Sequence, residues 1–449
     1  MLSCDSGNGR KYSRCLPSLL AMLLLSGCAS FGEGMARALM QQEREDTRQC
    51  YVRGQAFDGI EQLIEKTEQP GPKAGGDLKV LMVHGIGTHV PGYSTRLSEN
   101  LARELKLDVV AREPKVITLR LALGQEHIAS GATRGRLRGK PGDKNGTVRV
   151  TTYRSKTSDR KMTFYELTWS EITEVDKRII AYDDSGEYSF RRAGLNKELK
   201  QFVNAHLPDP LIYLGDAQLN IQLAVSQTLC WMFTRDFAQL PRQSDAVCQF
   251  QNYSPKEVRH DSFVFVSHSL GSRILTDAFQ IVTASLAQDA GRRNASPNVA
   301  AWRDALRSET LTVFMLSNQL PLLQLGRDAP EVTNQIADYC TPGGKKHAQR
   351  VFERTNIVAF SDPNDILSWA VPPAYEDENM DSRMCPNLVN VILNIAEVKT
   401  VLGIELAAPG EAHRGYDNDE RVIKLMARGM SDDKADPLTK KRCQWMEVR

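Results

Sequence analysis

Ser269 has the sequence surroundings of a serine that could act as a nucleophile. It lies in the segment Ser267-His268-Ser269-Leu270-Gly271, between an apolar run of Phe and Val residues and a stretch with helical spacing. A tight turn from a strand into a helix lifts a serine above a sheet, and the crowded backbone there requires small neighbours. The helix N-terminus beneath it presents free N–H groups to a developing oxyanion. The short motif is weak alone, and the competing interpretation is a buried serine in an ordinary strand–helix turn.

A nucleophilic serine needs a base, and the base needs a group that orients it. Candidates follow in the order serine, acid, histidine. Asp362 and Asp365 lie in SDPND after the apolar run NIVAF, and we favour Asp365 because it leads into a short apolar segment. The alternative acid, Asp362, would then be a turn-capping residue beside Pro363. His413, in AHRGY before the last predicted helix, is the expected base, since His347 lies in a glycine- and lysine-rich loop ahead of both acids.

The segment His84-Gly85-Ile86-Gly87 supplies candidates for an oxyanion hole. It directly follows the apolar run LKVLMV, and glycine at such a position lets backbone N–H groups approach a substrate. The expected donors are the amide of Ile86 and the amide of Leu270, the residue after the nucleophile. His84 is then a structural residue of the loop. His84 and His89 could also be metal ligands, but no HExxH-type pair accompanies them, so we predict no metal site.

Together these segments resemble an α/β-hydrolase of the lipase/esterase type. The resemblance rests on HGIG, SHSLG, SDPND and AHRGY and spans about residues 76–430, with 96 residues from Ser269 to Asp365 and 48 from Asp365 to His413. It implies a mostly parallel central sheet flanked by helices, no cofactor, and acyl transfer through an acyl-enzyme. In that chemistry Ser269 attacks a carbonyl, His413 moves the proton and Asp365 holds the imidazolium. Ser267 stands where the family pattern has glycine, a departure that another small residue can satisfy.

The pattern of apolar runs predicts the elements that would position these residues. Short continuous runs, typical of strands buried on both faces, alternate with helical stretches over about 350 residues, which indicates a doubly wound α/β sheet. The runs that predict strands cover residues 78–83, 116–123, 163–169, 262–266, 311–317, 356–360 and 388–398. Residues 171–258 lack such runs, and we interpret them as an inserted helical cap over the active site.

The remaining segments are assigned from composition. Residues 131–150 form a glycine-rich stretch with six basic residues and one acidic residue. We interpret it as a solvated loop, and the alternative is contact with a lipid headgroup or an anionic substrate. Residues 28–75 are expected to be a tether with one amphipathic helix, and residues 431–449 a C-terminal tail.

The first 28 residues resemble a bacterial lipoprotein signal. Three basic residues precede the apolar stretch Leu16–Leu25, which is too short to span a bilayer as a helix. The LSGC at its end resembles the lipobox, in which removal of residues 1–27 leaves Cys28 as a lipidated N-terminus. Ala29, rather than Asp, follows Cys28, and by analogy this favours an outer-membrane anchor facing the periplasm. The alternative is an ordinary signal peptide with a chance cysteine.

Composition and cysteine usage agree with an exported globular protein. The 449 residues include 57 Lys and Arg against 55 Asp and Glu, and removal of the signal leaves a net charge near zero, which argues against a nucleic-acid partner. Six cysteines remain besides those of the signal and Cys28, which suggests up to three disulfides among fifteen connectivities. Sequence proximity favours the pair Cys230–Cys248. The pairs Cys340–Cys385 and Cys50–Cys443 are then left over.

The residues leave two other functions open. The expected partners of a lipid-anchored esterase are an acyl ester or lipid substrate and the membrane that holds the anchor. One alternative is a non-catalytic lipoprotein that keeps the hydrolase scaffold as a binding or assembly module. The other is amide or thioester hydrolysis, which the sequence does not separate from ester hydrolysis because the same triad serves all three reactions.

Overall fold

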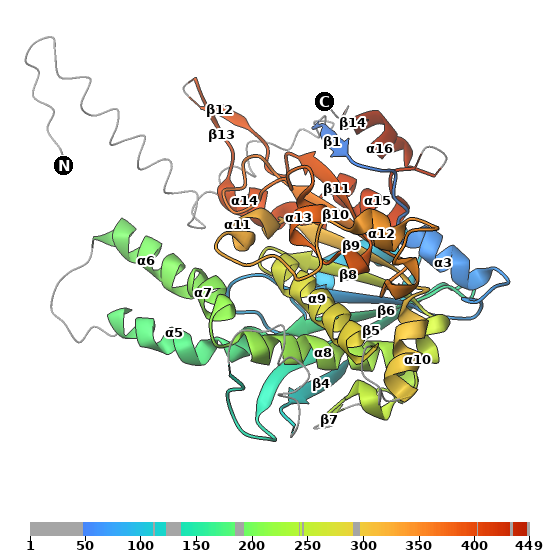
Figure 1. The fold of residues 1–449 in the computed structure, drawn as a ribbon. Coiled ribbons are helices and arrows are strands. Elements are labelled where there is room, and N and C mark those ends of the chain that lie inside the picture. The colour runs from blue at the N-terminus through green and yellow to red at the C-terminus, as the bar shows by residue number, and fades with distance from the viewer. Residues whose placement is uncertain are drawn as a thin grey trace, which may run out of the picture.

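The computed structural model describes residues 48–110, 113–122, 136–184, 193–241, 243–244, 247–290, 297–401, 403–431 and 434–446. They form an α/β arrangement in which helices flank a large, mostly parallel mixed sheet (Figure 1). The lipoprotein signal and Cys28 lie outside the described residues, as does part of the predicted basic loop. Within the described ranges, no helix is long and apolar enough to cross a membrane.

Six neighbouring strands at the centre of the sheet are parallel. In sheet order they are β6 (Lys161–Thr168), β2 (Leu78–Val83), β8 (Ser262–His268), β9 (Thr310–Leu316), β10 (Arg354–Ser361) and β11 (Pro386–Leu393). Each overlaps a run that the sequence predicts to be a strand, and these runs are largely apolar, as expected for strands that are buried on both faces. Because the six strands run in one direction, their carboxyl ends meet at one edge of the sheet.

Strands β5 and β1 pair antiparallel with the two sides of this centre, and further strands of mixed direction extend the sheet beyond them. Beyond β6 lie β5 (Lys144–Arg154), β4 (Lys115–Arg120), β3 (Asp108–Val109) and β7 (Gln243–Ser244). Beyond β11 lie β1 (Cys50–Arg53) and β14 (Cys443–Trp445). A separate hairpin pairs β12 (Lys399–Val401) with β13 (Ile404–Leu406).

Three segments differ from the sequence-based expectation. The stretch predicted as a basic loop over residues 131–150 becomes strand β5 at Lys144, where Val and Thr residues pair with β6. The predicted tether and the predicted tail each contribute a strand, since β1 pairs with β14. Such short strands carry too little periodicity to be recognised, and their pairing is decided by tertiary contacts.

Helices cover the sheet in two layers with separate cores. On one face pack α8 (Gln218–Thr234), α9 (Gly271–Ala290) and α10 (Pro297–Leu306). On the other face pack α3 (Ile60–Glu68), α4 (Thr95–Glu104) and α15 (Glu420–Arg428). Along β2 the side chains alternate between the two cores, with Leu81 on the first face and Met82 on the second, as the period of a strand requires. Shorter helices are α11 (Leu320–Gln324), α12 (Ile336–Cys340), α13 (Tyr375–Asn379), α14 (Pro409–Arg414) and α16 (Pro437–Arg442).

Residues 171–258, which the sequence predicts to be a cap, divide into two parts. Helices α5 (Glu174–Ala181), α6 (Gly194–His206) and α7 (Pro208–Leu214) project from one side of the body (Figure 1). Helix α8 instead lies in the core, with almost every residue buried against β5, β6 and α9. Its polar side chains find hydrogen-bond partners in the core, as Asn220 and Gln222 do, so the projecting insertion is limited to α5–α7.

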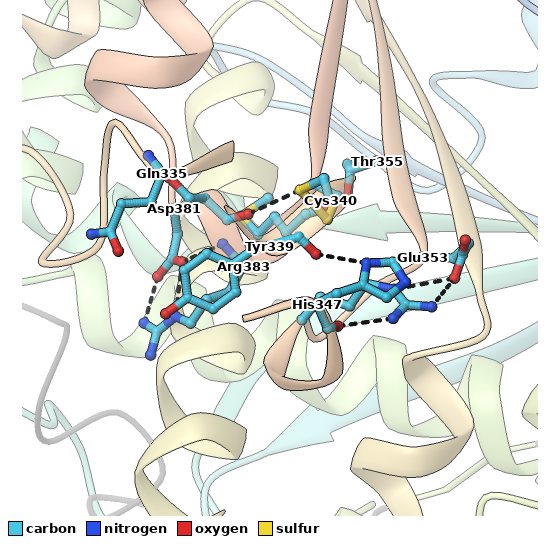
Figure 2. The surroundings of a disulfide bond; sticks show 12 residues. Gln335, Tyr339, Cys340, His347, Glu353, Thr355, Asp381 and Arg383 are labelled. Atoms are coloured by element: carbon cyan, nitrogen blue, oxygen red, sulfur yellow. Dashed lines mark hydrogen bonds and ion pairs between the residues drawn. A yellow bond between two sulfur atoms is a disulfide. The ribbon is translucent and has the colours of Figure 1, made fainter. Parts of the chain in front are cut away.

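The six cysteines of the described chain form three disulfides: Cys50–Cys443, Cys230–Cys248 and Cys340–Cys385. Figure 2 shows the surroundings of the third, where His347 Nδ1 donates to the carbonyl of Tyr339 at 3.1 Å. This disulfide joins the end of α12 to the residue before β11. It therefore fastens the long connection between β9 and β10 to the next strand of the sheet.

Replacing Cys50 and Cys443 together by serine is expected to lower the free energy of unfolding by about 2–5 kcal/mol. This disulfide closes a loop with a sequence separation of 393 residues, and it ties the edge strand β14 to its neighbour β1. Denaturant titration of the two proteins measures the loss. Peptide mapping without reductant should recover the three pairs named above, and a different pairing or free thiols would contradict the arrangement.

Candidate active site

The carboxyl edge of the parallel strands brings the predicted site residues together. Strand β8 ends at His268 directly before Ser269, and β2 ends at Val83 directly before His84. Strand β10 ends at Ser361, four residues before Asp365. Crevices at this edge are the usual ligand sites of open α/β sheets. The topology therefore places three separate segments at a location that suits a ligand.

Ser269 occupies a strained turn between β8 and α9. Its φ of 55° lies in the left-handed region, which a residue other than glycine adopts at a cost of about 1–3 kcal/mol. Its amide donates to the carbonyl of Leu316 at 2.9 Å, and its side chain is buried. A Cβ at Gly271 would lie 2.4 Å from the carbonyl oxygen of Val83. The helix after the turn therefore approaches β2 too closely for any larger residue.

His413 and Asp365 form a hydrogen-bonded pair. His413 Nδ1 lies 3.0 Å from both carboxylate oxygens of Asp365. Ser317, which follows β9, donates from Oγ to Asp365 Oδ2 at 2.7 Å and lies 2.9 Å from the same Nδ1. A carboxylate facing Nδ1 keeps the ring proton on that nitrogen, which leaves Nε2 as the basic nitrogen.

The carboxyl of Asp365 remains ionised at neutral pH. Burial acts to raise the pKa of Asp365, but hydrogen bonds and charge from His413, followed by the hydrogen bond from Ser317, hold that pKa below its ordinary value. Its side chain is fully buried, whereas that of His413 is 14% exposed. A buried carboxylate beside a partly exposed imidazole can stabilise an imidazolium while the ring still reaches a substrate.

Asp362 makes a different set of contacts. Its Oδ2 accepts from the amides of Ile395 and Ala396 at 2.7 and 3.1 Å. Its Oδ1 accepts from the amide of Asn364 at 2.7 Å. These bonds connect the loop after β10 to the loop after β11. Within the described residues, Asp362 makes no hydrogen bond or ion pair with His413, so the geometry favours Asp365 as the acid.

His268 links the nucleophile segment to the histidine segment. Its Nε2 lies 2.7 Å from the backbone oxygen of His413, and since a carbonyl only accepts, Nε2 carries the proton. The two rings meet edge to face with centroids 4.9 Å apart. The residue immediately before Ser269 thus holds the backbone of the expected base.

Ser269 Oγ itself makes no hydrogen bond to any described residue. Hydrogen bonds between catalytic groups are often long before a substrate binds.

The backbone of the predicted oxyanion loop passes close to the nucleophile. A Cβ at Gly85 would lie 2.5 Å from Ser269 Cβ and 3.1 Å from Ser269 Oγ, so only glycine fits there. Gly85 and Ser269 are the two residues that meet here, and Ile86 and Leu270 are the residues that follow them. Neither amide donates a hydrogen bond in the described part of the chain. Both are therefore available to a developing oxyanion.

His84 holds this loop by hydrogen bonds from both ring nitrogens. Its Nε2 accepts from the amide of Trp169 at 3.1 Å, so Nδ1 carries the proton and donates to the carbonyl of Gly85 at 2.8 Å. The ring stacks between Trp169 and His89, with centroids 4.6 and 4.0 Å away. Burial, followed by the proximity of His89, lowers the pKa of His84 well below its ordinary value. A neutral imidazole with both nitrogens occupied fits the structural role that the sequence predicts.

Two residues at this edge were not predicted from the sequence to belong to the site. Ser317, like Ser269, follows a buried strand and has a positive φ, here 50°. The only sequence signal for it is a polar residue at the end of an apolar run. His268 lies inside the SHSLG motif, but its bond to His413 crosses 145 residues. His347, by contrast, contacts Tyr339 near a disulfide (Figure 2) and makes no contact with these residues.

Comparisons with known proteins assign neither a family nor a function to this arrangement of residues. The chain matches no protein-family model, no curated protein and no solved structure. Within the described residues, no group of three or more His, Cys, Asp or Glu side chains is arranged to hold a metal ion. The chemistry of the site is therefore argued from its own residues.

His268 should make the protein less stable as the pH falls below about 6.5. Burial, with a contribution from His413, lowers the pKa of His268 from 6.5 to about 3. Between these values the unfolded chain binds a proton that the folded chain does not, so the free energy of unfolding rises with pH. His268→Gln removes this dependence. Because the ring is partly accessible, we expect the wild type to lose about 2 kcal/mol relative to the variant between pH 7 and pH 4.

Urea titrations of the wild type and His268→Gln at pH 7, 5.5 and 4 measure this difference. Groups that do not interact with His268 titrate in both proteins and cancel in the comparison. A constant difference across the three pH values would contradict a neutral, buried His268.

Proposed function

We propose that this chain is a serine hydrolase of the α/β-hydrolase type that cleaves carboxylic esters. The observation that carries the proposal is the Asp365–His413 pair beside a serine in a left-handed turn at the carboxyl edge of a parallel sheet. A positive φ at Ser269 is what a nucleophile turn requires. The chain order serine, acid, histidine is also that of this fold family.

The proposed reaction has two acyl-transfer steps. Ser269 Oγ attacks the ester carbonyl while His413 Nε2 takes the serine proton, and the amides of Ile86 and Leu270 stabilise the oxyanion. The tetrahedral intermediate expels the alcohol, which leaves with the proton from His413. Water then attacks the acyl-enzyme by the same route and releases the acid and free Ser269. Asp365 stays ionised throughout and stabilises the imidazolium.

Exposed apolar side chains support an acyl substrate. Ile366, the residue after Asp365, is 73% exposed, and Trp369 of the same loop is 36% exposed. Leu322 and Leu325, which follow Ser317, are also exposed. Large exposed apolar side chains in the segments that carry Asp365 and Ser317 would suit a ligand with an apolar chain and a polar head.

The proposed location is a lipid anchor on Cys28 at the outer membrane, facing the periplasm. Three disulfides in the described chain agree with an oxidising compartment. The described residues begin at Arg48, about 20 residues after Cys28, and an extended segment of that length reaches roughly 65 Å. The membrane is then close enough for the anchored domain to meet acyl lipids.

A comparison of one acyl group as ester, thioester and anilide tests the proposed reaction. We expect the purified protein to hydrolyse p-nitrophenyl octanoate fastest and Ser269→Ala to hydrolyse none of the three. Turnover of the anilide or thioester alone would replace ester hydrolysis by the corresponding reaction. Absence of turnover in folded protein with three disulfides would favour a binding or assembly module instead.

A further inference from the structure

We propose that Asp209, in the projecting insertion, is a positioning residue for the oxyanion hole. The inference rests on the proposed hydrolase function and adds to it, because it gives the insertion a part in transition-state stabilisation. Asp209 lies at the start of α7, far along the chain from the other site residues. Its side chain is completely buried.

Asp209 connects the oxyanion loop to the insertion. Its Oδ2 accepts a hydrogen bond from the amide of Gly87 at 2.6 Å. Its Oδ1 accepts from Thr173 Oγ1 at 2.7 Å and forms an ion pair with Lys177 at 2.8 Å. A buried carboxylate costs several kcal/mol unless it is paired and hydrogen-bonded. These partners satisfy both oxygens, so the position of the carboxylate is well determined.

The bond to Gly87 fixes a peptide next to the expected oxyanion donor. Gly87 N–H and the carbonyl of Ile86 belong to one planar peptide unit. The preceding unit carries Ile86 N–H and the carbonyl of Gly85, and His84 Nδ1 holds it at that carbonyl. Ile86 is thus held on both sides, by His84 from the loop and by Asp209 from the insertion. With both peptides fixed, the direction of the Ile86 N–H is set before a substrate binds.

The oxyanion loop also makes hydrogen bonds to residues at and just before the start of α5. Thr88 Oγ1 donates to Glu174 Oε1 at 2.6 Å, and the amide of His89 donates to Ser170 Oγ at 3.1 Å. Moving α5–α7 away from the body would leave the Gly87 N–H without its partner and would remove the bond between the Asp209 carboxylate and the oxyanion loop. The insertion therefore holds the oxyanion loop in place, and its displacement would disturb the oxyanion hole.

Asp209→Ala is expected to lower kcat, because it loosens a donor of the oxyanion hole. Removing one donor typically lowers kcat by 10²–10³-fold, and displacing it by about 1 Å can cost 10²-fold. Asp209→Ala leaves Ile86 N–H in place but frees one adjacent peptide. We expect kcat to fall about 10- to 100-fold with KM changed by less than about twofold, because the donor acts in the transition state.

Tyr213→Phe is the matched control. Tyr213 is also buried on α7 and donates to Asp277 Oδ2 at 2.6 Å, away from the oxyanion loop. Its loss should lower the melting temperature but leave kcat unchanged. Asp209→Asn keeps the side-chain shape and one acceptor oxygen, so its kcat should fall about three- to tenfold, and it tests the inference if Asp209→Ala does not fold.

Steady-state hydrolysis of p-nitrophenyl octanoate at a temperature where each variant is folded decides the question. A selective fall in kcat for the Asp209 variants supports the inference. Equal falls in kcat for Tyr213→Phe and Asp209→Asn, or unchanged kcat for the Asp209 variants, would assign Asp209 a stabilising role only. A wild type without turnover overturns the proposed function and this inference together, whereas active wild type with fully active Asp209 variants overturns this inference alone.

Discussion

Replacing Ser269 by alanine is expected to abolish ester hydrolysis while the protein stays folded. Loss of a triad serine costs up to about 10⁶-fold in kcat. Stability should not fall, because Ser269 Oγ is buried without a hydrogen-bond partner, and removal of an unpaired hydroxyl removes a desolvation cost. Alanine meets the same backbone strain at a φ of 55°. Hydrolysis rates and melting temperatures of the two proteins measure both effects.

Ser267→Ala is the matched control for this variant. Its hydroxyl is also buried and unpaired, and it lies two residues earlier in the same motif. Alanine at this position remains small enough for the crowded turn, so activity should stay within about threefold of wild type. Equal loss of activity in both variants would point to a distorted turn and would contradict Ser269 as the nucleophile.

Replacing Asp365 by asparagine should lower kcat by about 10³–10⁴-fold. An amide can present its NH₂ group to His413 Nδ1, which favours the ring tautomer with the proton on Nε2. That tautomer cannot accept the proton of Ser269. The side-chain shape is conserved, so the protein should remain folded, and steady-state rates on p-nitrophenyl octanoate measure the loss.

Asp362→Asn separates the two acids of the SDPND loop. It should destabilise the protein by about 1–3 kcal/mol, because an amide cannot accept from the amides of Ile395, Ala396 and Asn364 as a carboxylate does. We expect activity within about tenfold of wild type. An inactive Asp362→Asn together with an active Asp365→Asn would reverse the assignment of the acid.

Much of the sheet could be predicted because its strands are buried on both faces. Strand β2 is apolar except for Lys79, and β8 contains the run Phe263–Val266; such largely apolar runs carry a strong signal. A contact between the expected acid and base could also be predicted, since they follow in chain order and lie near an element boundary. Asp365 and His413 do meet at 3.0 Å.

Other features depend on tertiary contacts that no local pattern records. Helix α8 has several polar residues, yet it is buried on all sides because side chains such as Gln222 and Asn220 find hydrogen-bond partners in the core. Strands β1 and β14 are short and pair across the whole chain. Asp209 looks like an ordinary helix-start acid between two prolines, and only the fold reveals its bond to Gly87.

Labelling with a fluorophosphonate tests the central claim most directly. The probe reacts with serines that a neighbouring base activates, and it needs no knowledge of the natural substrate. We predict that intact protein gains one phosphonyl group, that peptide mapping places it on Ser269, that Ser267→Ala labels normally and that Ser269→Ala does not label. Folded protein with its three disulfides that takes up no label, or that carries the label on another serine, would contradict the proposed active site.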